Sequence, residues 1–320
     1  MPLLHSSVLG TIGNTPLVEL RRVVPDGCAR ILVKIEGANP TGSMKDRMAM
    51  AVIEAAERDG RLKSGDTVVE YTGGSTGASL ALVCSAKGYP IRIFSSDAFS
   101  EEKLVQMVAF GAELTIIPSG DGLITKQVIL AMIAAAREAS RAPATYWTDQ
   151  LNNRDMIAGY YPMGEEIWTQ SEGRVDAFVQ AIGTSASLQG VATVLRRNNP
   201  HVRIVAVEPG ESAVLSGGPS GAHKIDGIGI GYIPPLWDPD IVDEVIPVST
   251  ADANAMALRL TEQEGLFAGI SSGANVVAAI RVGERFGPDM TVTTLLVDSG
   301  LKYLATYGKM LAPRIRCQPA

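Results

Sequence analysis

The stretch TVVEYTGGSTGASLALVCSAK, residues 67–87, decides the fold class. Its first five residues, TVVEY, are rich in β-branched residues, as is typical of a buried strand. A glycine-rich turn follows at 73–77, and residues 78–87 then have the length and composition of a helix. A strand, a tight turn and a helix in this order are typical of a parallel α/β sheet.

The same alternation continues on both sides of this stretch. Further strands are predicted at 31–35, 91–95, 113–118, 177–182, 203–208 and 293–298. Further helices are predicted at 47–59, 101–110, 125–140, 155–170, 188–197, 251–264 and 274–286. The pattern predicts parallel sheets covered by helices.

Length and irregular segments indicate how the chain is organised. At about 100–200 residues per domain, 320 residues make one large domain or two tightly associated ones. Polar residues at 150–154 separate two α/β halves, and we interpret them as a domain crossover. Residues 209–239 hold many Gly and Pro and no periodicity, and a loop of this length in a compact protein is usually functional.

Composition excludes several classes of protein. The chain is 46% hydrophobic and 19% charged, with a net charge of −6, so neither disorder nor a nucleic-acid or anionic-membrane partner is expected. The longest apolar run, 128–136, is about half of what a bilayer requires. The first basic residue is Arg21, so no signal peptide is expected. We therefore expect a soluble, cytoplasmic protein.

Cysteine and histidine are too scarce for two other classes. Cys28, Cys84 and Cys317 are far apart and lack CxxC spacing, so neither a disulfide framework nor a zinc site is expected. With three His in the chain, a multi-histidine metal centre is nearly excluded as well.

Short motifs exclude some nucleotide sites and leave one hydrolase alternative open. The run GIGIG at 227–231 does not complete GxGxxG, and no GxxxxGK is present. The turn at 73–77 matches GxSxG, so Ser75 could be a hydrolase nucleophile. A triad would need an acid and a base further on, either Asp149 or Asp176 and then His201 or His223.

The glycine turns make better sense together as anion-binding sites. Turns at 73–77, 183–187 and 271–273 each lead into a helix N-terminus, where free N–H groups and the helix dipole favour anions. In parallel sheets such turns converge at the carboxyl edge, and a cofactor phosphate and a substrate carboxylate would suit them. Lys45, at a loop-to-helix junction, supplies a candidate reactive group, since a lysine held out of water can form Schiff bases.

Several blocks resemble the cysteine synthase (O-acetylserine sulfhydrylase) branch of the fold type II pyridoxal-phosphate enzymes. They are TIGNTPLVEL at 11–20, NPTGSMKDR at 39–47, EYTGGSTG at 70–77, GTSAS at 183–187, HKIDGIGIGYIP at 223–234, GLFAGISSGA at 265–274 and DSGLKYLAT at 298–306. These blocks cover nearly the whole chain in the order of the family.

The resemblance implies an architecture and a cofactor. It implies two domains, a smaller mobile one at 46–150 and a larger cofactor-binding one at 1–45 plus 151–320, with the active site in the cleft between them. It also implies twisted, mostly parallel sheets, bound pyridoxal 5'-phosphate and a homodimer.

It also implies roles for particular residues. Lys45 would hold the cofactor as a Schiff base and then move the substrate Cα proton. The cofactor would be bound by Ser75, Gly183, Thr184, Ser185, Ala186, Ser187 and Ser271, the last at the pyridine nitrogen. The substrate carboxylate would be bound by Thr72, Gly73, Thr76 and Gln150, with Gly227 and Gly229 flanking the site.

The implied reaction is β-replacement on an activated serine, such as O-acetylserine or O-phosphoserine. It would pass through an aminoacrylate, to which a small nucleophile adds. The chain departs from the family pattern where Gly73 replaces Ser, Ser75 replaces Asn, and Ser185-Ala186 replaces Gly-Gly. These departures leave alternatives open: a β-elimination lyase or desulfhydrase, a synthase of another β-substituted alanine, a serine hydrolase using Ser75, or a non-catalytic scaffold.

Overall fold

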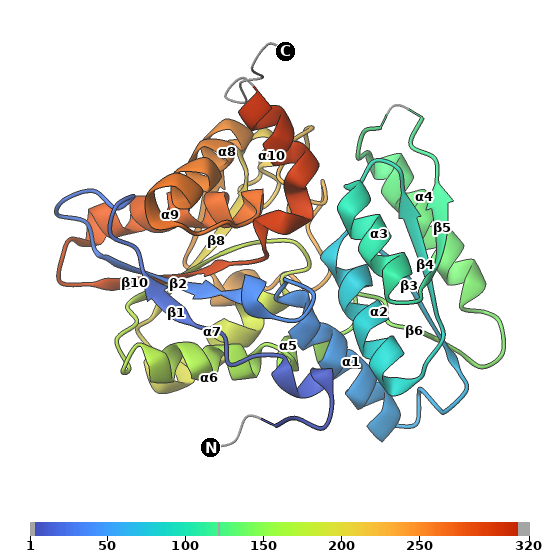
Figure 1. Ribbon diagram of the computed structural model, residues 1–320. Helices are drawn as coiled ribbons and strands as arrows, with labels where there is room; N and C mark the ends of the chain where they lie inside the picture. The colour runs from blue at the N-terminus through green and yellow to red at the C-terminus, as the bar shows by residue number, and fades with distance from the viewer. Residues whose placement is uncertain (1–3, 121, 313–320) are drawn as a thin grey trace, which may run out of the picture.

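The computed structural model describes residues 4–120 and 122–312, whose strands form two sheets (Figure 1). The larger sheet has six strands in the order β1-β2-β10-β7-β8-β9. Their bounds are β1 Leu17–Glu19, β2 Arg30–Ile35, β10 Thr291–Leu296, β7 Ala177–Ala181, β8 Arg203–Pro209 and β9 Glu244–Val248. All neighbours are parallel except β1, which runs antiparallel to β2.

The smaller sheet has four parallel strands in the order β5-β4-β3-β6. Their bounds are β5 Glu113–Ile117, β4 Ile91–Ser96, β3 Thr67–Tyr71 and β6 Thr145–Trp147. The whole sheet therefore comes from one continuous stretch of chain, between the first strand pair and the rest of the larger sheet.

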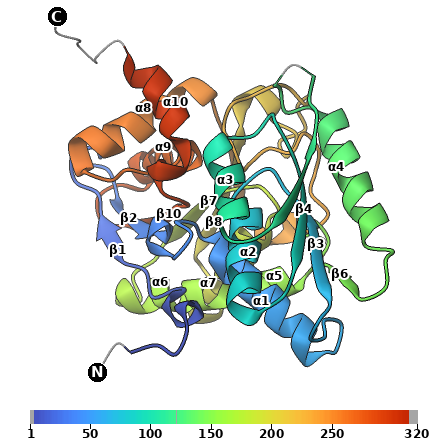
Figure 2. The ribbon, with the colours of Figure 1, turned by 45° about the vertical axis from the view of Figure 1, so that its right-hand side comes forward.

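Helices cover both faces of each sheet (Figures 1 and 2). In the larger part, α6 and α7 lie on one face and α8 and α9 on the other; in the smaller part, α2 and α3 lie opposite α4. The bounds are α1 Lys45–Arg58, α2 Ser75–Lys87, α3 Glu101–Ala109, α4 Lys126–Ala139, α5 Asp155–Ala158, α6 Tyr161–Gln170, α7 Ala186–Asn198, α8 Thr250–Arg259, α9 Ile270–Phe286 and α10 Leu304–Leu311.

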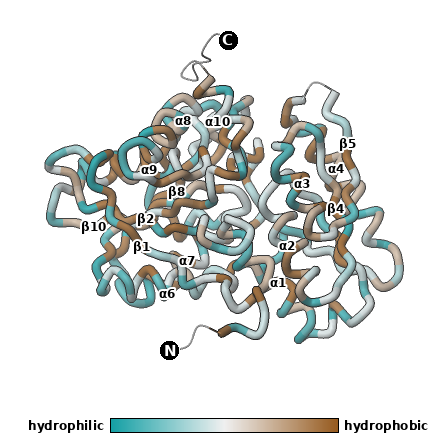
Figure 3. The backbone as a smooth tube through the Cα atoms, in the orientation of Figure 1, coloured by the Kyte–Doolittle hydropathy of each residue, from teal (hydrophilic) through white to brown (hydrophobic). Residues whose placement is uncertain are grey.

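The apolar core is continuous between the two sheets. One buried cluster contains Val68 and Ile93 of the smaller sheet together with Phe178 and Ile204 of the larger one. Hydrophobic stretches follow the strands, while the outer helices mix hydrophobic and hydrophilic residues (Figure 3). The mixed α/β class with mostly parallel sheets is confirmed.

Two of the predicted helices were wrong in extent. The predicted helix 155–170 is broken between α5 and α6, because Gly159 packs against α1 and Pro162 begins a new helix. A Cβ on Gly159 would lie 2.8 Å from the Cβ of Ala51, so this crossing requires glycine. The predicted helix 251–264 ends as α8 at Arg259 and continues as a π-helical turn, Leu260–Glu264.

The sequence pattern missed the short strands β1, β6 and β9 and the final helix α10. The three residues of β1 and of β6 give too little pattern to be recognised, and β9 contains a proline, which weakens its strand signal. The predicted loop at 209–239 is present, with one short 3₁₀ turn at Gly210–Ser212 inside it.

Two other observations concern the cysteines and the helices. Cys28 and Cys84 are buried and unpaired, and Cys317 lies outside the described residues. In the described part of the chain, no helix has the length and apolarity needed to cross a membrane.

Candidate active site

Lys45 is placed by a backbone contact between its own loop and the end of β10. The Met44 N–H donates to the Val297 carbonyl at 3.0 Å, and the Ser299 N–H donates to the Gly42 carbonyl at 2.9 Å. Lys45 then opens helix α1 at the carboxyl edge of the larger sheet. This pairing brings the lysine beside Asp298.

The electrostatic surroundings of Lys45 favour its neutral form. Burial, reinforced by the nearby charge of Lys103 and opposed by Asp298, lowers the pKa of Lys45 to about 8. Among the described residues, its ammonium group has no hydrogen-bond partner. A lysine that is desolvated and unpaired in this way has the properties of a nucleophilic amine.

Asp298 is the carboxylate that faces this lysine. Its Oδ2 accepts the Tyr303 hydroxyl at 2.7 Å and the Ser75 hydroxyl at 3.4 Å. Its Oδ1 is buried with no hydrogen-bond partner in the described structure, and burial raises its pKa. The site therefore holds one unsatisfied buried oxygen, a feature that suggests a missing ligand or water.

Among the described residues, Ser75 has no histidine as a hydrogen-bond partner. Its hydroxyl contacts Asp298, while the His223 ring bonds to the Gly229 carbonyl at 2.8 Å. The serine–histidine pair that a hydrolase triad requires is therefore not formed by Ser75 and His223.

A second lysine enters the site from the smaller sheet. Lys103, on α3, is 2% exposed, forms an ion pair with Asp226, and lies 4.1 Å above the centre of the Tyr303 ring. Asp226 directly precedes Gly227, so this pair joins α3 to the glycine-rich loop of the other half.

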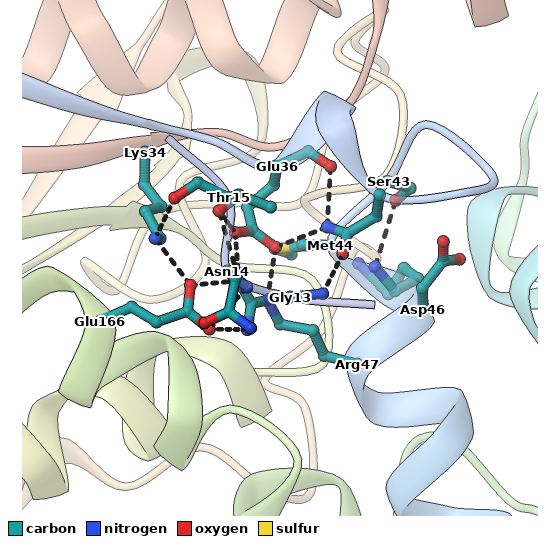
Figure 4. Close-up of polar contacts among 12 residues, drawn as sticks. Gly13, Asn14, Thr15, Lys34, Glu36, Ser43, Met44, Asp46, Arg47 and Glu166 are labelled. Atoms are coloured by element: carbon teal, nitrogen blue, oxygen red, sulfur yellow. Dashed lines mark hydrogen bonds and ion pairs between the residues drawn. The ribbon is translucent and has the colours of Figure 1, made fainter. Parts of the chain in front are cut away.

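Helix α1 is anchored by buried ion pairs (Figure 4). The Arg47 guanidinium pairs with Glu36 at 2.7 Å and with Glu166 at 2.8 Å. Lys34, which is fully buried, reaches the same Glu166 at 2.6 Å. Burial raises the pKa of Glu166, but the hydrogen bonds and charges of Arg47 and Lys34 outweigh it and lower that pKa to about 2. These pairs fix the helix whose first residue is Lys45.

Asp46 fixes the same helix from its other side. Its carboxylate accepts the Thr41 N–H at 2.8 Å and the hydroxyls of Thr41 and Ser79, each at 2.5 Å. Because Ser79 belongs to α2, these bonds connect the Lys45 helix to the helix that follows the turn 73–77.

The predicted substrate loop and Gln150 are brought together by Glu70. Glu70 accepts the Gln150 N–H at 2.9 Å, and the Gln150 side chain donates to the Tyr71 carbonyl at 2.7 Å. Burial raises the pKa of Glu70 to about 7, against the lowering effect of its hydrogen bonds. The Thr72 hydroxyl accepts the Gly74 N–H at 3.1 Å, which shapes the start of the turn that also carries Gly73 and Thr76.

The predicted phosphate loop connects β7 to the N-terminus of α7. Ser185 has a φ of 75°, in the left-handed region that the glycine at this position in the family pattern would adopt without strain. Ala186, which also replaces a glycine of the pattern, is not in that region. A Cβ on Gly183 would lie 2.6 Å from the Gly227 carbonyl oxygen, and the Gly229 N–H donates to the Ile182 carbonyl at 3.0 Å. The two glycine loops therefore lie against each other.

Ser271, at the start of α9, has a free hydroxyl. It is 2% exposed and makes no side-chain hydrogen bond within the described residues. Its neighbour Ser272 accepts the Val297 N–H at 2.9 Å instead. The two serines thus differ, since one hydroxyl supports β10 and the other is available to a ligand.

The family model described as pyridoxal-phosphate dependent enzyme matches residues 8–298. The chain belongs to this family. It is 41% identical to "Cysteine synthase" of Staphylococcus aureus strains Mu50 and N315 over 297 residues, 92% of this chain and 94% of the relative.

Solved structures of family members have the same fold. A cysteine synthase from Entamoeba histolytica has a TM-score of 0.89 at 35% identity, covering 100% of this chain and 94% of its own. An O-ureido-L-serine synthase has a TM-score of 0.89 at 33% identity, and the match covers 98% of each chain. A hydrogen sulfide-producing enzyme from Fusobacterium nucleatum has a TM-score of 0.88 at 32% identity, and the match covers 94% of this chain and 100% of the other.

This pyridoxal-phosphate-dependent enzyme has residues that fit its cofactor. The turn at 183–187, which leads into helix α7, would supply an anion site, the free Ser271 hydroxyl a hydrogen-bond donor, and Lys45, whose pKa is lowered, an amine. The predicted cofactor is confirmed, and membership of this family does not support the hydrolase alternative. Asp298 and Lys103 were missed. Asp298 follows a buried strand, which is a usable signal, but a lysine in an amphipathic helix is usually exposed.

Proposed function

We propose that this enzyme catalyses β-replacement on an activated L-serine, with O-acetyl-L-serine as the first substrate to test and a small nucleophile such as sulfide as the second. The observation that carries the proposal is the position of Lys45, whose ammonium has no hydrogen-bond partner among the described residues, whose pKa is lowered by burial, and which lies beside Asp298, the carboxylate that the Ser75 hydroxyl of the loop 73–77 contacts. The identity to cysteine synthases over most of the chain supports it.

The proposal assigns a binding role to each side of the site. Gly183, Thr184, Ser185, Ala186 and Ser187 would hold the cofactor phosphate, with Ser271 at the ring nitrogen and Ser75 beside the ring. Thr72, Gly73, Thr76 and Gln150 would hold the substrate carboxylate, and Gly227 and Gly229 would flank it. Bound pyridoxal phosphate supplies the electron sink that allows the Cα proton and the β-leaving group to depart.

Lys45 is the group that would move the proton. Its pKa of about 8 leaves it able to accept a proton near neutral pH and to return it afterwards. The charge of Asp298 stabilises the ammonium form of Lys45 and raises its pKa. The charge of Lys103 favours the neutral amine and lowers that pKa.

A second candidate is net β-elimination, which releases pyruvate and ammonia. It is favoured by the departures at Gly73 and Ser75, since the side chains that normally line the substrate loop are smaller here. The structural similarity to a hydrogen sulfide-producing enzyme supports it too.

One assay separates these candidates. Purified protein loaded with pyridoxal phosphate is given O-acetyl-L-serine with and without sulfide, and cysteine and pyruvate are measured. We expect cysteine with sulfide; pyruvate in both arms would indicate elimination. Lys45→Ala should abolish either activity, while Lys63→Ala, at an exposed position, should retain it. A wild type that forms neither product would contradict the proposal.

We also propose the organisation that the family resemblance implies. Residues 46–150 would form the smaller, mobile domain, and 1–45 plus 151–320 the larger one. The enzyme would be a cytoplasmic homodimer. Sedimentation equilibrium tests the dimer, and a monomer at all concentrations would exclude it.

A further inference from the structure

Position 73 in the substrate loop has no room for a side chain. A Cβ on Gly73 would lie 2.0 Å from Cε1, 2.1 Å from Cζ and 2.3 Å from Cδ1 of Phe99. Gly73 is not in the left-handed region, so crowding and not backbone conformation requires a glycine here. The ring of Phe99 fills the space in which family members carry a serine side chain.

The ring is held in place by its own surroundings. Phe99 lies between β4 and α3, and its N–H donates to the Ser96 carbonyl at 3.3 Å. Its side chain packs against the buried cluster that contains Val69, Tyr71 and Phe94 of the smaller sheet. A ring packed on this cluster cannot simply rotate away from Gly73.

The neighbouring residue of the loop is covered from the same side. A Cβ on Gly74 would lie 3.6 Å from Cδ and 3.8 Å from Nζ of Lys103, one turn further along from Phe99. Ile230 and Tyr232 of the glycine-rich loop pack against the same cluster as Phe99. The start of α3 and the glycine-rich loop thus share the apolar cluster that supports the substrate loop.

We propose that Phe99 is a positioning residue for the amino-acid substrate. Its ring supports the loop 72–76 from behind and reserves position 73 for glycine. The substrate carboxylate is then held by backbone N–H groups and threonine hydroxyls of the loop, without a hydroxyl from residue 73. This inference rests on the proposed function, in which that loop binds the carboxylate.

Four variants test the coupling between the two positions. Gly73→Ser should raise the KM for O-acetyl-L-serine at least about tenfold and leave the KM for sulfide unchanged, since only the amino-acid loop must shift. In the double variant Phe99→Ala/Gly73→Ser, the KM for O-acetyl-L-serine should lie within about threefold of its value in Phe99→Ala alone, because the added hydroxymethyl group then has space. Ile133→Ala, which trims the same cluster from α4, should not rescue Gly73→Ser.

A readout without turnover separates failure of this inference from failure of the proposed function. The Tm of the holoenzyme should fall with Gly73→Ser and recover in the double variant, whatever the reaction is. Full activity of Gly73→Ser, strictly additive effects of the two substitutions on KM and Tm, or equal rescue by Ile133→Ala would each overturn the inference.

Discussion

Ser185 carries a backbone conformation that its side chain disfavours. With a φ of 75°, it pays the steric cost of the left-handed region that a glycine avoids. We predict that Ser185→Gly raises the free energy of unfolding by about 0.5–1 kcal/mol. Urea denaturation of the cofactor-free protein measures this. Ala186→Gly, at the first residue of α7 and outside that region, is the matched control and should give no gain.

The lowered pKa of Lys45 predicts how cofactor loading depends on pH. The neutral amine reacts with an aldehyde, and its fraction rises as the pH passes through the pKa. The loading rate of the cofactor-free protein should therefore reach half its maximum near pH 8 and not near the ordinary lysine value of 10.5. Stopped-flow absorbance across neutral and alkaline pH measures this rate.

Replacing Lys103 tests the direction in which a neighbouring charge shifts that pH profile. Because its charge lowers the pKa of Lys45, Lys103→Met should shift the loading profile to higher pH. Lys63→Met, at an exposed position, should leave the profile in place. A profile that moves to lower pH in Lys103→Met would refute this electrostatic account.

At the scale of the element, helix α1 depends on charges that cannot be left unpaired. Arg47→Met leaves Glu36 and Glu166 without their guanidinium, so we predict a loss of about 3–5 kcal/mol in the free energy of unfolding. Arg30→Met removes the pair with Glu19, whose side chains are 39% and 35% exposed, and should cost about 0–1 kcal/mol. Chemical denaturation measures the free energy of unfolding of both variants. Equal losses would argue against the idea that burial makes the Arg47 pairs more important for stability than the exposed Arg30 pair.

The longer elements were predictable because their signals are local. Strands such as β3 and β10 are rich in β-branched residues, and the glycine turns after β3 and β7 mark helix starts. The edge strand β1 was not predictable, since its three residues owe their conformation to pairing with β2. The break between α5 and α6 likewise depends on the approach of α1 to Gly159.

The candidate site was predictable only where its residues belong to recognisable loops. Lys45 and the glycine turns have local signatures in the sequence. Asp298, Lys103 and Phe99 acquire their roles from contacts between segments far apart in the chain. The Lys103–Asp226 pair spans 123 positions, and Ser75 and Asp298 are separated by 223. Pairings over such distances follow from the fold and not from any local pattern.

At the scale of the whole molecule, polar contacts join helix α3 of the smaller part to the larger part. The Lys302 ammonium, from the C-terminal segment, donates to the Thr41 carbonyl at 2.9 Å and to the side chain of Gln106 on α3. The Ala305 N–H donates to Glu102 of the same helix at 2.7 Å. Lys103 crosses in the opposite direction to Asp226. Helix α3 is therefore fixed to the larger part by polar groups that require their partners.

These contacts predict how the two parts unfold. Lys302→Met leaves the side-chain oxygen of Gln106 without the Lys302 donor and leaves the Thr41 carbonyl with the Gln106 amide as its donor, so the smaller sheet should unfold at lower urea concentration than the larger one. Of the three tryptophans, Trp147 lies in β6, so a Trp168→Phe/Trp237→Phe background makes fluorescence report the smaller sheet alone. In that background, fluorescence and far-ultraviolet circular dichroism should give coincident transitions. Adding Lys302→Met should separate them, with fluorescence changing first, whereas Lys309→Met, at an exposed position, should not. Coincident transitions in Lys302→Met would mean that the continuous apolar core alone keeps the two sheets cooperative.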